Sequence, residues 1–144
     1  MPRSPYFTVA GTWSRCCTKG GVSTARKKAL IAEDDEALRR MMVTLLRPFN
    51  LQVDEARDGL EAVERLRDHP YDVVIVDLMM PRVDGYSVIR YLEEKQPQAR
   101  AIITSAVNDA DLAPVARSNV VRGVLSKPFD IDEFSSSVRE AIAA

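Results

Sequence analysis

Five polar side chains of this sequence stand at or just after short apolar runs, where they could carry out chemistry. They are three acids, a hydroxyl and an amine: Glu33, Asp34, Asp77, Ser105 and Lys127. Three carboxylates gathered in one place repel one another unless a hard cation joins them, and oxygen ligands with retained water suit Mg²⁺. A lysine beside them suits a phosphoryl group, and a hydroxyl can hydrogen-bond one of its oxygens. Together these groups are the parts of phosphoryl transfer to a carboxylate.

Each of these residues also has a plain structural interpretation. An acid after a strand is often a helix cap or a turn residue, and the neighbouring Asp35 is expected to cap the first helix. Ser105 could bond to backbone, and Lys127 could be a solvated lysine at a strand end. Each interpretation is plausible by itself. All of them together, at the same end of several strands, are less so, which favours a site.

The elements that must position these residues alternate regularly along the chain. Strands are expected at residues 28–32, 51–56, 73–76 and 101–104 and within 120–125, and each is followed by a segment of helical periodicity. The β-branched run at 73–76 indicates a strand buried on both faces, whereas the alternation at 51–56 indicates an edge strand. Five strands alternating with five helices predict an α/β fold, a doubly wound parallel sheet with helices on both faces. Ligands of such sheets bind beyond the carboxyl ends of the strands, where the five residues would meet.

The helices differ in how clearly they are marked. Leu38, Met41, Met42, Leu45 and Leu46 recur at helical spacing, and Pro48 should end that helix. A weaker helix is expected at 111–118, with Pro114 tolerable only near its first turn. Asp130 or Asp132 would start the last helix, whose apolar face is expected to comprise Ile131, Phe134, Val138 and Ile142.

Composition limits the class of protein. The 144 residues are 46% hydrophobic and 28% charged, as in a soluble domain, and no apolar run is long enough to predict a membrane span. Six of the 20 Lys and Arg precede Glu33, which leaves 14 against 21 acids and argues against direct nucleic acid binding. We expect residues 1–24 to be a disordered or weakly ordered basic extension and 25–144 to be the folded domain. The adjacent Cys16 and Cys17 have no metal or redox spacing, so a cytoplasmic protein is expected.

The motifs resemble those of a known family. From about residue 27 to 144 the chain resembles the receiver domain of two-component response regulators. The resemblance rests on residues 29–35 with Glu33, Asp34 and Asp35, on 76–81 with Asp77, on Asp84 and Gly85, on Ser105 and Ala106, and on Lys127, Pro128 and Phe129. It implies a flavodoxin-like, five-stranded parallel sheet in the order 2-1-3-4-5.

The resemblance also implies a role for each matching residue. Asp77 would accept a phosphoryl group from a phosphohistidine of a histidine kinase or histidine phosphotransfer protein. Asp34, Asp77 and the backbone carbonyl of Met79 would hold Mg²⁺, and Glu33 would act through bound water. Lys127 would pair with the phosphoryl oxygens, Ser105 would hydrogen-bond one of them, and the bond between Lys127 and Pro128 is expected to be cis.

Two positions depart from the family pattern. An aromatic residue, whose rotation reports phosphorylation, often stands three positions before the lysine, and here that residue is Val124. The usual glycine before the fifth strand is replaced within residues 119–121, so we expect a short or irregular fourth helix. Both departures bear on how phosphorylation would be passed to an unknown downstream protein.

Three functions remain distinguishable. The first is a phospho-acceptor switch, which is not an enzyme with turnover beyond its own phosphorylation and dephosphorylation. The second is a receiver-like module that binds partners without phosphate, whose mark would be the loss of an acid, Ser105 or Lys127. The third is a Mg²⁺-dependent phosphatase working through an aspartyl-phosphate, which would need a second acid where Met79 stands.

Overall fold

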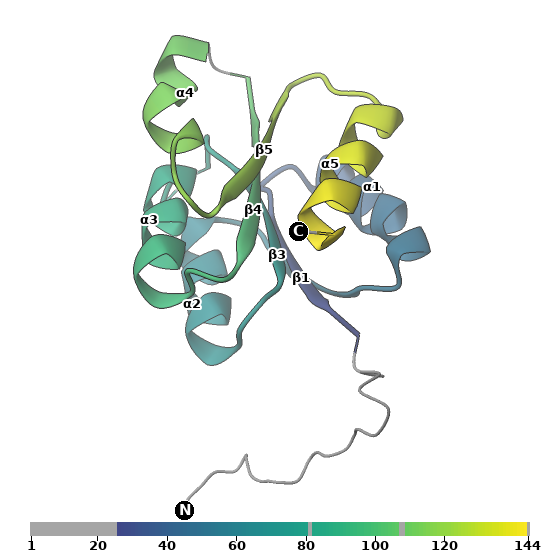
Figure 1. Ribbon diagram of the computed structural model, residues 1–144, viewed down its shortest axis with the longest axis horizontal. Helices are drawn as coiled ribbons and strands as arrows, with labels where there is room; N and C mark the ends of the chain where they lie inside the picture. Colours follow the sequence, from purple (N-terminus) through teal and green to yellow (C-terminus); the bar gives the residue numbers. More distant parts are fainter. Residues whose placement is uncertain (1–25, 81, 107–108, 144) are drawn as a thin grey trace, which may run out of the picture.

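The computed structural model describes residues 26–80, 82–106 and 109–143 (Figure 1). The expected extension at 1–24 lies outside the described residues. Elements follow in the order β1 (Lys28–Ala32), α1 (Glu36–Leu46), a 3₁₀ helix (Arg47–Phe49), β2 (Gln52–Ala56), α2 (Gly59–Asp68), β3 (Val73–Asp77), α3 (Gly85–Lys95), β4 (Arg100–Ser105), α4 (Asp109–Ala116), β5 (Val121–Ser126) and α5 (Ile131–Ala143). No helix of this described part is long and apolar enough to cross a bilayer.

The five strands form one parallel sheet in the order β2-β1-β3-β4-β5, which confirms the predicted fold class and the edge position of β2. Helices α2, α3 and α4 cover one face and α1 and α5 the other (Figure 1). Strand residues alternate between two buried clusters because successive side chains point to opposite faces. In β3, Val74 and Val76 pack with α2 and α3, whereas Val73 and Ile75 pack with α1 and α5.

Aspartates begin the first three helices by accepting a hydrogen bond from a backbone N–H of the first turn. Asp35 Oδ1 accepts from Leu38 N at 3.0 Å, which confirms the expected cap of α1, and Asp58 and Asp84 do the same for α2 and α3. Because Asp84 is the cap of α3, the third acid of the predicted site, Asp77, is not needed as a helix cap. It is the last residue of β3.

The buried faces of two helices differ from the sequence expectation. In α1 the buried residues are Arg39, Met42 and Leu46, whereas Met41 is 39% exposed. The apolar spacing thus predicted the helix correctly but not its buried edge, which includes a cation. In α5, Phe134 and Val138 are buried as expected, but Ile131 is exposed because it is the first residue of the helix.

Helix α4 begins two residues earlier than predicted and ends at Ala116. Pro114 therefore lies inside the helix, where it removes one backbone donor, and the expectation of a first-turn proline is wrong. The helix has eight residues, the shortest of the five α-helices in the described part, as expected for a short or irregular element.

Candidate functional site: an acidic cluster with one lysine

The ends of the strands bring the predicted residues to one edge of the sheet. Glu33 directly follows β1, Asp77 and Ser105 end β3 and β4, and Lys127 directly follows β5. Sheet alternation places Glu33 and Asp77 on the face of α1 and α5, two residues beyond Ile31 and Ile75 of the buried cluster on that face. The structure thus brings together residues up to 94 positions apart in sequence.

Lys127 joins two buried acids. Its Nζ donates to Asp77 Oδ2 at 2.9 Å and to Glu33 Oε2 at 3.0 Å. Glu33 is fully buried and Asp77 is 3% exposed, whereas about a quarter of the lysine side chain is exposed. The peptide bond between Lys127 and Pro128 is cis, as expected.

Asp34 completes an acidic cluster. One carboxylate oxygen each of Glu33, Asp34 and Asp77 lies within 4.8 Å of the others, and Asp34 is exposed, so the cluster opens to solvent. The donors are all oxygens, which fits a hard cation such as Mg²⁺ and not a softer metal. Three carboxylates with one ammonium also leave an excess of negative charge that such a cation would neutralise.

Burial and hydrogen bonding shift two ionisation equilibria at the site. Burial raises the pKa of Glu33 to about 7, against the lowering effect of the Asp35 N–H and of Lys127. Burial lowers the pKa of Lys127, but its hydrogen bonds to Asp77 and Glu33 outweigh this, so the pKa lies above the ordinary value. The lysine is therefore a permanent cation, whereas Glu33 exchanges a proton near neutrality.

The turn after β3 packs closely against Asp77. Met79 N donates to Asp77 Oδ1 at 3.1 Å. A Cβ on Gly85 would lie 2.5 Å from the Asp77 carbonyl oxygen, so only glycine allows α3 to start this near to the strand end. The Asp84 and Gly85 pair thus helps to fix the position of Asp77. That the Met79 carbonyl is a metal ligand stays a prediction.

Ser105 and its neighbour Thr104 lie at the same edge. Ser105 is fully buried, and its carbonyl accepts from Lys127 N at 2.8 Å, which ties β4 to the lysine. Thr104 is the register partner of Asp77 and is also fully buried, yet its hydroxyl has no hydrogen-bond partner among the described residues. Sequence reasoning treated Thr104 only as a strand residue, and a hydroxyl in an apolar run was the available signal.

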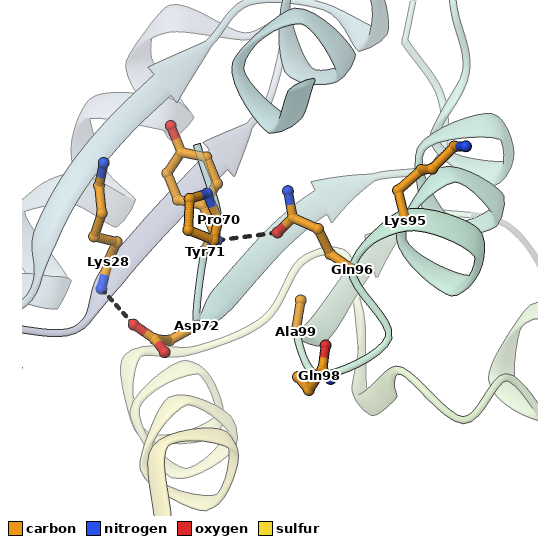
Figure 2. Close-up of a pocket in the computed structure, with 8 residues that line it drawn as sticks. All are labelled: Lys28, Pro70, Tyr71, Asp72, Lys95, Gln96, Gln98 and Ala99. Carbon is orange, nitrogen blue, oxygen red and sulfur yellow. Dashed lines mark hydrogen bonds between the residues drawn. The ribbon is translucent and has the colours of Figure 1, made fainter. Parts of the chain in front are cut away.

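Two hollows lie at opposite places on the molecule. One, of about 450 Å³, lies beside the lysine and is lined by Leu38, Met41, Lys127, Pro128 and Phe129. The other, of about 360 Å³, lies at the amino ends of β1, β3 and β4, and Figure 2 shows the polar and apolar residues that line it. Of the site residues, Lys127 lines the first hollow, and none lines the second.

The family model described as "Response regulator receiver domain" matches residues 29–139. The chain belongs to this family. Receiver domains are signalling modules, and the match spans β1 through most of α5, including every residue of the site.

Curated relatives agree with this receiver assignment. The response regulator receiver protein CpdR of Brucella abortus is 29% identical over 82% of this chain and 98% of its own length. The transcriptional regulatory protein PdtaR of Mycobacterium tuberculosis is 34% identical, and the DNA-binding transcriptional regulator NtrC of Escherichia coli is 31% identical. The chain spans about half of PdtaR and about a quarter of NtrC.

Solved receiver structures have the same fold. The Francisella response regulator 1452 receiver domain has a TM-score of 0.73 at 29% identity, covering 82% of this chain and 98% of that one. The signal receiver domain of an HD domain-containing protein from Pseudomonas fluorescens has a TM-score of 0.76 at 25% identity, covering 83% and 96%.

Val124, three positions before Lys127, is 36% exposed on β5. A valine cannot reproduce the turning of an aromatic ring between a buried and an exposed position. The segment after Ser105 lies partly outside the described residues.

Proposed function

We propose that this receiver domain accepts a phosphoryl group on Asp77 from a phosphohistidine of a histidine kinase or a histidine phosphotransfer protein. The observation that carries the proposal is the position of Lys127, whose Nζ contacts the nearly buried Asp77 and the fully buried Glu33. This places a fixed positive charge beside a carboxylate that borders a solvent-open acidic cluster. Such a charge stabilises a phosphoryl group as it arrives.

The transfer exchanges one bond to phosphorus for another. A carboxylate oxygen of Asp77 attacks the phosphorus, the bond from phosphorus to the histidine nitrogen breaks, and that nitrogen keeps the electron pair. Lys127 pairs with the phosphoryl oxygens, and the Ser105 hydroxyl donates a hydrogen bond to one of them. Ser105 ends β4 and Lys127 directly follows β5, so their spacing is set by the pairing of these two adjacent strands.

Mg²⁺ is the cofactor of this proposal. Asp34, Asp77 and the Met79 carbonyl would hold it, and Glu33 would act through a bound water. When bound, the ion neutralises charge on the phosphoryl oxygens. The all-oxygen donor set and the excess of acids over lysine at the site support this assignment.

Phosphorylation would then bias two conformations of the domain, for which a few kcal/mol of differential interaction suffices. With Val124 at the position of the family's aromatic residue, the change would pass to a downstream protein through the loop after Ser105 or through backbone shifts. The acidic charge of the folded domain supports a protein partner and not a nucleic acid. A cytoplasmic location is part of the proposal.

The direct test is incubation with Mg²⁺ and a small acyl-phosphate donor, followed by intact-mass measurement. We expect the wild type to gain one phosphoryl group and Asp77→Asn to gain none. A wild type without mass gain contradicts the proposal and leaves a phosphate-independent module. Continuous release of phosphate from assorted esters would instead identify a phosphatase.

The domain division is part of the proposal. We assign phosphoryl acceptance to residues 25–144 and no part in it to the extension at 1–24. Deleting residues 1–24 should leave the rate of mass gain unchanged, and a slower gain would show that the extension contributes to the site.

A further inference from the structure

Arg39 of α1 is a nearly buried cation with two partners on different elements. It is 8% exposed. Its Nε donates to Glu55 Oε1 on β2 at 2.9 Å, and its Nη1 donates to the carbonyl oxygen of Glu33 at 3.0 Å. The adjacent Arg40 differs, because it is exposed and pairs with Glu36 within the same helix.

The second partner of Arg39 distinguishes it from a simple ion pair between a helix and a strand. A contact with Glu55 alone would attach α1 to the edge strand. The fork of the guanidinium instead also reaches the peptide of Glu33, the first acid of the metal cluster. A lysine ammonium lacks this fork and cannot reproduce both contacts in the same geometry.

Every polar atom of Glu33 is thereby engaged. Its N–H donates to the Ala56 carbonyl at 3.1 Å, and its carbonyl accepts from Arg39. Its carboxylate accepts from the Asp35 N–H at 3.1 Å and from Lys127. Two of these contacts, through Ala56 and through the Arg39 and Glu55 pair, tie the acid to β2, which contributes no residue to the cluster.

The peptide that Arg39 holds is the one that joins Glu33 to Asp34. Because it links the two residues, its orientation affects where their carboxylates lie, and one oxygen of each lies within 4.8 Å of an Asp77 oxygen. Groups that orient metal ligands through a second hydrogen bond change metal affinity when they are removed, by about 10-fold to 100-fold.

We propose that Arg39 and Glu55 are positioning residues of the acidic cluster, which raise its affinity for Mg²⁺ by holding the peptide between Glu33 and Asp34. This inference rests on the proposed function, since it concerns the same metal site. It adds that the edge strand β2 sets the geometry of that site.

Mg²⁺ titration followed by amide chemical shifts tests the proposal without any measurement of activity. The positioning role and the loss of charge predict opposite changes in the Mg²⁺ affinity of Arg39→Ala. Loss of a nearby cation would by itself strengthen Mg²⁺ binding, whereas loss of the peptide contact weakens it. We expect Arg39→Ala to bind Mg²⁺ about 10-fold more weakly. Arg40→Ala, which removes an equal charge from the same helix, should bind no more weakly than wild type.

Two further variants separate geometry from folding. Arg39→Lys keeps the charge and one contact, so its Mg²⁺ affinity should fall between those of wild type and Arg39→Ala. Glu55→Ala should weaken binding more than the matched Glu36→Ala, which removes the surface acid paired with Arg40. Should Arg39→Ala fail to fold, these two variants decide the question.

The proposal is overturned when folded Arg39→Ala binds Mg²⁺ as tightly as wild type or more tightly, or when Arg40→Ala is weakened equally. It is also overturned when Arg39→Lys matches wild type and Glu55→Ala matches Glu36→Ala. A wild type that binds no Mg²⁺ and gains no phosphoryl group overturns the proposed function as well. A wild type that is phosphorylated normally while the Arg39 variants keep full Mg²⁺ affinity overturns only the positioning role.

Discussion

Polar residues gather both at the amino ends of the parallel strands (the amino edge) and at their carboxyl ends (the carboxyl edge), but their roles differ. At the amino edge, Lys28 N donates to Asp72 Oδ2, and Gln96 Oε1 accepts from Tyr71 N (Figure 2). The Tyr71 hydroxyl donates to Asp54 Oδ2 at 2.6 Å, and burial together with this acid raises the tyrosine pKa. These contacts fasten strands and loops to one another.

At the carboxyl edge, like charges are brought together instead. Glu33, Asp34 and Asp77 lie close together with one ammonium, which contacts Glu33 and Asp77, the two acids that are buried. Gathering like charges costs stability, so a protein that does so at one edge and not at the other marks that edge as the place for a ligand. Polar residues at strand ends are therefore not informative by themselves. What indicates a ligand site is uncompensated charge among these residues.

Removing Lys127 should have the largest effect on stability of the substitutions that test this contrast. Lys127→Met leaves Glu33 and Asp77 buried without a cation, and we expect a loss of about 3 to 5 kcal/mol in unfolding free energy at pH 8 without Mg²⁺. Urea denaturation measures this. Lys95→Met, at the amino-edge hollow, is the control and should change stability by less than about 0.5 kcal/mol. Equal losses in the two variants would contradict the contrast between the edges.

The pKa of Glu33 predicts a pH dependence of stability. Folding raises that pKa from the ordinary 4.5 to about 7, so in this range the folded state holds a proton that the unfolded state has released. Stability should therefore fall as pH rises from about 4.5 to 7, by no more than about 3 kcal/mol, and level off above. Chelator-containing denaturation series of wild type and Glu33→Gln measure it. A decline that persists unchanged in Glu33→Gln would assign it to another group.

At the amino edge, Gln96→Ala should affect stability but not chemistry. The side chain makes three hydrogen bonds, with the Leu66 and His69 carbonyls and the Tyr71 N–H. Their loss should lower the unfolding free energy by about 2 kcal/mol, while the gain of phosphoryl groups per molecule stays at the wild-type level. The exposed Gln98→Ala is the matched control. Slower phosphorylation of a folded Gln96→Ala would show that the two edges are coupled.

Removing one charge from the acidic cluster and one from the partner of Tyr71 should change the unfolding free energy in opposite directions. Asp34→Asn relieves repulsion in the cluster, so without Mg²⁺ it should stabilise the fold by about 1 kcal/mol while weakening Mg²⁺ binding. Asp54→Asn loses its charge-assisted bond with Tyr71 and should destabilise by a similar amount. Thermal denaturation with and without Mg²⁺ compares the two. Destabilisation by both substitutions would remove the evidence for repulsion at the carboxyl edge.

Much of the site followed from residue types at strand ends. In a parallel sheet every carboxyl end lies on one side, so Glu33, Asp77 and Lys127 had to approach one another once the strands were placed. Arg39 was missed for a physical reason. An arginine within a helical stripe counts as polar in any hydrophobic pattern, and only its partners on β2 and at Glu33 explain how its charge is buried.

The sequence by itself determined the alternation of five strands and five helices, the edge on which the acids gather and the cap of the first helix. These properties depend on local periodicity, turn chemistry and the direction of the chain, which neighbours in sequence specify. The tertiary structure alone decided that Lys127 bridges Asp77 and Glu33, that Pro114 lies within α4 and that α1 buries Arg39 against β2. Those properties depend on distances between residues far apart in sequence, which no local pattern contains.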